Sequence, residues 1–343
     1  MNFKRILGTI VAALLAVIIV GAVMKERADA HYFDDYDPNL DAGLQVRSVT
    51  EQDGYVLEDF TFQARPGEQV PTLLARPADS AGKLPLILFL HGIGQKKEFL
   101  KDICKPFVQN GFAFACFDQY MQGERKLPKE SSALAQVNAF LDRPWKTVND
   151  SRRFLDYVAL RGDIDPERIY VVGASYGAIT GSTFAARDPR VRAIALVYGG
   201  GDINKMLQAP MIEQEVANNY PQLGPWMPLL RNTLAYLLDA ADPVHYAAGI
   251  SPRPVLLQNG KEDLVIGTPG AEALQAAVQE PKTIQWYEGD HIGLDVDTVK
   301  VVLLAGMKWI VEQDAEFRGG DTSLAQDSLA FFNADEAPAS EGA

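Results

Sequence analysis

The feature that most constrains this chain is a repeated alternation between short, mostly apolar runs and longer stretches with a helical pattern. The apolar runs lie at residues 86–90, 112–117, 169–172, 193–198, 255–258 and 283–287. Helical patterns lie at residues 97–110, 147–160, 177–186 and 299–311. Continuous apolar strands that alternate with helices are typical of a parallel sheet covered on both faces. The sequence therefore predicts one large α/β domain.

Two strand patterns precede this alternation, at residues 55–64 and 70–75, and Gly67 marks the turn between them. A second turn is expected at residues 165–168, just before the strand at 169–172. The alternation breaks once, over residues 201–253, which contain several Met and aromatic residues. We interpret this segment as a helical lid, although a second layer of ordinary core explains the same residues.

The first thirty residues resemble an export signal or a membrane anchor. An apolar run over residues 6–23 follows Lys4 and Arg5, and Ala28-Asp29-Ala30 fits a signal-peptidase site. The run is long enough to span a bilayer, and the charges before Ala30 favour an uncleaved anchor over a cleaved signal. Both alternatives stay open. Both export the folded domain, which is either held by residues 6–23 or released after Ala30.

The remaining boundaries follow from composition. Residues 31–45 are polar and acidic and are interpreted as a spacer, and residues 46–315 form the folded domain. Residues 316–343 are rich in Gly, Asp, Ser and Ala, which predicts a disordered acidic tail.

Charge and cysteine content exclude several classes of function. The net charge of −13 would repel a phosphate backbone, so we expect no nucleic-acid binding. No Cys-x-x-Cys pair or Cys/His cluster is present, so we expect no metal site and no cofactor. Cys104 and Cys116 form a disulfide if the protein is exported, or else remain two buried free thiols.

The nucleophile candidate is Ser175, in the motif Gly173-Ala174-Ser175-Tyr176-Gly177. The motif directly follows a predicted strand and opens a predicted helix, which is the setting that a nucleophile elbow requires. The flanking glycines suit a turn too tight for a Cβ atom. The elbow would place the serine oxygen at the carboxyl edge of the sheet, beside a helix N-terminus that favours negative charge.

A serine hydroxyl needs a base, and His291 alone among the histidines follows the last predicted strand. In the chain order Ser, then Asp or Glu, then His, the acid should leave the preceding strand. Asp263 is our choice for the acid, with Glu262 as its neighbouring rival. Asp202, one strand earlier, is a second rival.

Acyl transfer also needs backbone N–H groups directed at the developing oxyanion. We expect them from Tyr176 and from Ile93, in the loop His91-Gly92-Ile93-Gly94, with His91 in a structural role. A second loop at the same edge carries Tyr120 and Arg125, which could line a pocket, although structural pairing explains Arg125 equally well. Trp226 of the predicted lid is a third pocket candidate.

Over residues 50–312 the chain resembles the α/β-hydrolase superfamily. The resemblance rests on the His91-Gly92 loop, the 118–125 segment, the elbow at Ser175, Gly260 with Asp263, and His291. Within the superfamily the chain looks most like dienelactone-hydrolase-like and acetylesterase-like proteins. The resemblance implies a mostly parallel, eight-stranded-type sheet flanked by helices. True dienelactone hydrolases use a cysteine nucleophile, whereas this chain has serine at that position.

The expected function is hydrolysis of a small carboxylic ester through an acyl-enzyme intermediate. A peptidase or an acyltransferase would use the same machinery. A hydrolase-fold protein that only binds a ligand is a further alternative, although all three triad candidates are present. The sequence does not name the ester.

Overall fold

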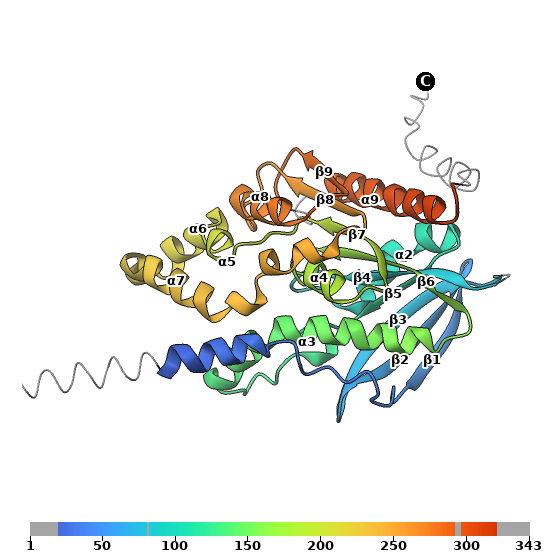
Figure 1. Ribbon diagram of the computed structural model, residues 1–343, viewed down its shortest axis with the longest axis horizontal. Coiled ribbons are helices and arrows are strands. Elements are labelled where there is room, and N and C mark those ends of the chain that lie inside the picture. The colour runs from blue at the N-terminus through green and yellow to red at the C-terminus, as the bar shows by residue number, and fades with distance from the viewer. Residues whose placement is uncertain (1–19, 81, 292–295, 321–343) are drawn as a thin grey trace, which may run out of the picture.

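A computed structural model describes residues 20–80, 82–291 and 296–320. Its centre is a nine-stranded sheet with the order β1-β2-β3-β5-β4-β6-β7-β8-β9 (Figure 1). The strands in chain order are β1 (Gln45–Gln52), β2 (Tyr55–Arg65), β3 (Glu68–Pro77), β4 (Leu84–Leu90), β5 (Ala113–Phe117), β6 (Ile164–Ala174), β7 (Val191–Val197), β8 (Val255–Gly260) and β9 (Lys282–Tyr287). The first three strands pair antiparallel, as does β3 with β5, and the remaining pairs are parallel. The prediction of a mostly parallel sheet is confirmed.

Helices cover both faces of the sheet because its central strands are apolar on both sides. In β4, Leu86 and Leu88 pack into one core and Ile87 and Phe89 into the other. On the first face lie α3 (Ala133–Ala159), α4 (Tyr176–Arg187) and α8 (Thr268–Ala277). On the second lie α2 (Leu100–Gln109) and α9 (Val296–Phe317). The alternation of side chains along each strand therefore builds two cores from one run of sequence.

Three elements differ from the prediction. The edge strand β1 was missed because all of its residues are exposed, which leaves no apolar pattern to detect. Helix α3 begins at Ala133, where the Ser132 hydroxyl caps it, and continues through Pro144. The expected turn at residues 165–168 belongs to β6. Its pairing with β4 jumps from Leu84↔Ile164 to Leu86↔Ile169, so the polar residues form an irregularity inside the strand.

The segment interpreted as a spacer is packed against the domain. Phe33 is only 3% exposed, and the Tyr32 hydroxyl donates to the carbonyl of Leu141 on α3. Asn149 of α3 donates to the backbone carbonyls of Phe33 and Asp35. The spacer interpretation was wrong for this part of the segment, because its aromatic residues Tyr32 and Phe33 contact the domain.

Residues 20–30 form a mostly exposed helix just before this segment (Figure 1). No helix within residues 20–80, 82–291 and 296–320 has both the length and the hydropathy that crossing a membrane requires. Most of the predicted anchor at 6–23, and the tail from residue 321 onward, lie outside the described residues.

Between β7 and β8 the chain forms α5 (Ile203–Met206), α6 (Pro210–Asn219) and α7 (Met227–Leu237), with 3-10 turns before and after α7. Figure 1 shows α6 and α7 projecting from one end of the molecule, beyond the sheet. The helical character of residues 201–253 agrees with the sequence, and the role of a lid stays a prediction.

Candidate active site

Ser175 lies on the sharp turn between β6 and α4, with φ at +54° and ψ at −117°. This backbone conformation is unusual for a residue with a side chain, and the flanking glycines explain how the turn closes. A Cβ on Gly173 would lie 2.3 Å from the carbonyl oxygen of Gly177. A Cβ on Gly177 would lie 1.9 Å from the carbonyl oxygen of Leu90. The elbow therefore requires both glycines, and it leaves Ser175 partly exposed.

His291 links the serine to an acid. Its ring Nε2 lies 2.9 Å from Ser175 Oγ, and its Nδ1 lies 2.8 Å from Asp263 Oδ2. A carboxylate can only accept, so the proton on the Asp263 side belongs to Nδ1. Nε2 of the neutral ring is then an acceptor that faces the serine hydroxyl. This is the tautomer that a general base needs.

Hydrogen bonds to backbone N–H groups fix the positions of Asp263 and of the loop that carries His291. Asp263 Oδ1 accepts the N–H groups of Val265 and Ile266, both at 2.8 Å. Asp290 Oδ1 accepts the N–H groups of His291 and Leu264, which ties the two loops together. His291 is only 8% exposed, and Asp263 is only 4% exposed. The triad is therefore shielded from water except at the serine.

The rivals for the acid lie elsewhere. Glu262 is exposed, and Asp202 caps α5 by accepting the N–H of Lys205. Among the histidines, His31 and His245 are exposed beside acidic partners. The structure thus brings together Ser175, Asp263 and His291 out of the candidates that the sequence offered.

The loop after β4 lies directly against the nucleophile. A Cβ on Gly92 would lie 3.3 Å from Ser175 Cβ. The N–H groups of Gly92 and Gly94 donate to the side-chain oxygens of Gln95 and Gln122. Within the described part of the chain, no acceptor is recorded for the N–H of Ile93 or of Tyr176. The role of these two N–H groups as oxyanion donors stays a prediction.

His91 is fully buried, and its Nδ1 donates to the carbonyl oxygen of Gly92 at 3.0 Å. Burial lowers the pKa of His91 to about 4, and the nearby charge of Arg143 acts in the same direction. His91 is therefore neutral, and its place in the loop agrees with the structural role expected for it.

The pocket candidates fare differently. Arg125 forms ion pairs with Glu68 and with Asp150 Oδ2, the latter at 2.6 Å. Its role is therefore the structural pairing that was expected as the alternative to a pocket residue. Tyr120 is half-buried beneath the cations of Arg125 and Lys146. Trp226 is 60% exposed, and its side chain forms no hydrogen bond or aromatic contact with any described residue.

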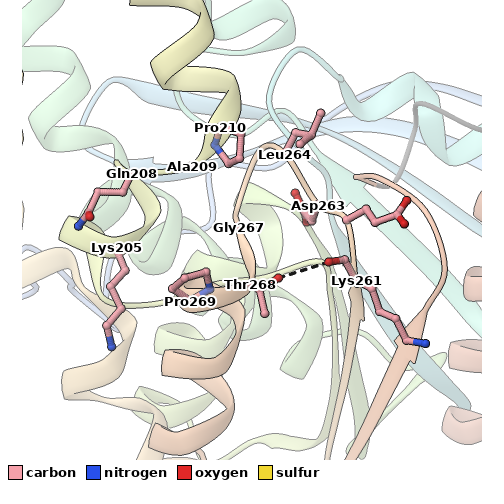
Figure 2. Close-up of a pocket in the computed structure, with 11 residues that line it drawn as sticks. Lys205, Gln208, Ala209, Pro210, Lys261, Asp263, Leu264, Gly267, Thr268 and Pro269 are labelled. Atoms are coloured by element: carbon pink, nitrogen blue, oxygen red, sulfur yellow. Dashed lines mark hydrogen bonds between the residues drawn. The ribbon is translucent and has the colours of Figure 1, made fainter. Parts of the chain in front are cut away.

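Asp263 also lines a cleft of ≈ 540 Å³ (Figure 2). Its lining combines the loop from Lys261 to Leu264 with residues 208–210 before and at the start of α6. Lys205 and Lys261, which also line it, are paired with Asp202 and Glu288. The cleft therefore offers no unpaired lysine, and only the Asp263 loop connects it with the triad.

Neither cysteine is in the site, and the described residues hold no disulfide. Cys104 and Cys116 are free and fully buried, so the disulfide alternative is wrong. Burial raises the pKa of the Cys104 thiol to about 11 and that of Cys116 well above its usual value. The described residues also contain no cluster of three or more His, Cys, Asp or Glu side chains suited to a metal ion.

Several residues around the site were not predicted from the sequence. Asp290 stands next to His291 in the sequence, and its Asx-type contact could have been anticipated. Tyr198 packs edge-on against the His291 ring, with centroids 5.6 Å apart, and burial raises its pKa to about 12. Arg143 stacks on Tyr176, which no local pattern indicates because α3 is remote from the elbow in sequence.

Comparison with known proteins agrees with this geometry. Residues 83–242 match the family model described as "Serine aminopeptidase, S33". A "Putative carboxymethylenebutenolidase" of Escherichia coli (strain K12) is 26% identical over 183 residues, covering 51% of this chain and 66% of that protein. The chain thus spans just under two thirds of the length of this relative.

Two further proteins match over more of their length. Esterase YjfP of Escherichia coli (strain K12) is 26% identical over 229 residues, covering 64% of this chain and 85% of that protein. The crystal structure of acetyl xylan esterase 1 from Thermoanaerobacterium sp. JW/SL YS485 superimposes with a TM-score of 0.61 at 18% identity, covering 82% of this chain and 93% of that one. The sheet order, the elbow and these matches show that the chain has the α/β-hydrolase fold.

Proposed function

We propose that this protein hydrolyses carboxylic esters through an acyl-enzyme intermediate. The observation that carries the proposal is the continuous connection from Ser175 Oγ through His291 to Asp263, at 2.9 and 2.8 Å, beside two unpaired N–H groups. Nucleophile, base and oxyanion donors are the parts that acyl transfer needs.

The geometry assigns a role to each part. His291 Nε2 takes the hydroxyl proton as Ser175 Oγ attacks the ester carbonyl, and the N–H groups of Ile93 and Tyr176 receive the oxyanion. His291 then gives the proton to the leaving alcohol, and a water activated in the same way releases the acid. Asp263 stabilises the imidazolium throughout without being protonated itself.

The names of the relatives support ester chemistry. One similar protein is called an esterase, and the superimposable structure is an acetyl xylan esterase. The family model carries the name of an aminopeptidase, so amide hydrolysis by the same triad is the second candidate.

The test is a series of 4-nitrophenyl esters from acetate to palmitate, with Ser175→Ala as the matched variant. We expect hydrolysis that the substitution abolishes, and labelling by a fluorophosphonate probe that it also abolishes. Aminoacyl 4-nitroanilides distinguish the amide alternative, since a peptidase would cleave these in preference to the esters. The proposal is wrong if the folded protein neither hydrolyses an ester nor reacts with the probe.

We further propose that the enzyme is exported and works at a membrane to which residues 6–23 attach it. The support is the apolar sequence of that segment, followed by a helix in which Val20, Val23 and Met24 are exposed. Cell fractionation tests this: the full chain should resist carbonate extraction from membranes, and a variant that begins at His31 should be soluble. N-terminal sequencing of the mature protein would reveal cleavage after Ala30 and contradict the anchor.

A further inference from the structure

Arg143 is a buried cation that has no ion-pair partner among the residues that the structure describes. Its side chain lies on α3 and is only 8% exposed. Nε and Nη2 are buried with no acceptor, and no described residue forms a hydrogen bond or ion pair with the guanidinium. The adjacent carboxylate, Asp142, accepts the indole N–H of Trp145 instead. Burial accordingly lowers the pKa of Arg143.

The chain treats its neighbouring buried arginines differently. Arg65 pairs with Glu68 and Asp150 at 2.8 and 2.7 Å, and Arg125 pairs with the same two carboxylates. A buried charge is costly unless it is paired and hydrogen-bonded, and an apolar side chain of similar size usually serves stability better. Stability therefore explains Arg65 and Arg125 and leaves Arg143 unexplained.

The position of Arg143 connects it with the active site. Its guanidinium lies over the ring of Tyr176, with Cζ 4.2 Å from the centroid. Tyr176 follows the nucleophile directly and supplies one of the two oxyanion donors. The charge also reaches His91, which begins the loop with the other donor. Arg143 thus contacts the residue that carries one predicted oxyanion donor, and its charge acts on the loop that carries the other.

The surroundings of Arg143 carry an excess of positive charge. Arg143, Lys146 and Asp150 are spaced three and seven residues apart, so they share one face of α3. Three cations, those of Arg65, Arg125 and Lys146, pair with two carboxylates, Glu68 and Asp150, and Arg143 adds a further cation on the same face of α3. Such an excess is notable in a chain whose net charge is −13. It would attract an anion to this side of the nucleophile.

We propose that Arg143 is the binding residue for a carboxylate group on the substrate, so that the preferred substrates are esters carrying a negative charge. This rests on the proposed function, because it names the substrate class of the same site. The planar guanidinium, stacked on Tyr176 and short of acceptors, is prepared for a carboxylate oxygen. The carboxylate belongs to the acyl part or to the leaving group of the ester.

Two other roles for Arg143 predict different results. A guanidinium that stabilised the oxyanion would accelerate neutral and anionic esters alike. A guanidinium that only packed on Tyr176 would affect stability and leave the choice of substrate unchanged. Substrate pairs that differ in charge but hardly in shape separate the three roles.

The experiment compares the full-length protein with Arg143→Met, which keeps an unbranched, flexible side chain and removes the guanidinium with its charge. For an acyl carboxylate the pair is 4-nitrophenyl hemiglutarate and 4-nitrophenyl pentanoate. For a leaving-group carboxylate the pair is 4-acetoxybenzoate and 4-methylphenyl acetate. We expect the ratio of kcat/KM, anionic over neutral, to fall about 10- to 100-fold in Arg143→Met for one of the two pairs. Arg143→Lys should retain part of the preference.

Arg192→Met is the matched control. Arg192 also stacks on an aromatic ring, that of Phe317 at 4.0 Å, but it lies at the start of β7, at the opposite edge of the sheet from Ser175. The same change of net charge there should leave the ratio unchanged. A fall of equal size in both variants would mean that general electrostatic attraction, and not a subsite, sets the preference.

A binding measurement separates failure of this inference from failure of the proposed function. The ligand is monomethyl glutarate if the acyl pair shows the effect and 4-acetoxybenzoate if the leaving-group pair shows it. This ligand should bind Ser175→Ala, measured by calorimetry, and should bind at least tenfold more weakly when Arg143→Met is added. If esters are hydrolysed but Arg143→Met changes neither the ratio nor this affinity, the carboxylate subsite is wrong. If no ester is hydrolysed while binding still depends on Arg143, the subsite stands and the hydrolase proposal is wrong.

Discussion

Asp263 accepts the Nδ1–H of His291 at 2.8 Å with one carboxylate oxygen and two backbone N–H groups with the other. Both oxygens are thus committed, and the carboxylate cannot turn without breaking contacts on both sides. The backbone of His291 is also held, because its amide N–H donates to Asp290 Oδ1. The base is therefore oriented before any substrate arrives, which removes a reorganisation cost from the reaction.

The first prediction follows from this relationship. Asp263→Asn should lower kcat about 10⁴-fold, because the amide can donate to the ring and favour the wrong tautomer. Ser175→Ala and His291→Ala should each cost about 10⁶-fold. Glu262→Gln and Asp202→Asn are the matched controls and should keep nearly full activity. A large loss in either control would move the acid to that residue.

Glycines of the elbow give a second prediction. Gly177→Ala should abolish activity and sharply reduce the yield of folded protein, because its Cβ would lie 1.9 Å from a backbone oxygen that has little room to move. Gly181→Ala, one turn further along α4, meets only side-chain carbons, the nearest at 3.4 Å. It should raise stability by up to about 1 kcal/mol through helix propensity. Thermal unfolding of both variants checks this, and equal tolerance of the two would contradict the close approach.

Much of this structure could be predicted because the chemistry and the apolar strands are local in the sequence. The loop at Ile93, the elbow at Ser175 and the loop carrying Asp263 each follow a largely buried strand, and the loop carrying His291 follows the partly exposed β9. Parallel strands bring their carboxyl ends to one edge, so four separate segments converge without any long-range information.

What the sequence did not reveal depends on packing between distant segments. Strand β1 has no buried side chain, so it can be identified only from its backbone pairing with β2. The sequence places Phe33 in a polar segment, and its contact with Tyr246 joins residues that are far apart in the chain. The sequence around Arg143 is that of an ordinary helix. Only the structure shows that its guanidinium is buried without an acceptor among the described residues.

The cysteines give a third prediction. Both thiols are fully buried, and burial raises the pKa of Cys104 to about 11, so almost no thiolate is available at neutral pH. Iodoacetamide should leave the native protein unmodified for hours and add two groups once it is denatured without reductant. Mass spectrometry measures this. Denatured protein that accepts no label until it is reduced would demonstrate a disulfide.

Packing of residue 33 gives a fourth prediction. Phe33 contacts Tyr246 edge-on at 5.4 Å and lies beneath the guanidinium of Arg187. Phe33→Ala should lower the free energy of unfolding by about 3–5 kcal/mol. Leu44→Ala, in the same segment but 44% exposed, should change it by less than about 0.5 kcal/mol. Urea denaturation compares the two, and equal small effects would restore the spacer interpretation.

The last prediction concerns the pH dependence of stability. His91 is buried and neutral, with its pKa lowered from 6.5 to about 4 in the folded state. Between these values the unfolded chain binds a proton at this position and the folded chain does not. Stability therefore rises with pH across this window and is lost as the pH falls from about 6.5 to 4. The full effect is roughly 3 kcal/mol, since one pKa unit corresponds to about 1.4 kcal/mol.

His91→Asn isolates this contribution. The asparagine amide can replace Nδ1 as donor to the carbonyl of Gly92, and it does not titrate. Cations lower the pKa of carboxylates such as Glu58 and Glu124, so protonation of these groups destabilises the fold only below about pH 4.5. Between pH 4.5 and 6.5 the change in stability therefore comes largely from histidine. Urea denaturation across this range should give a slope that is shallower by up to about 1.4 kcal/mol per pH unit in the variant. Identical slopes would show that another group carries the acid sensitivity and that His91 is not held neutral by the fold.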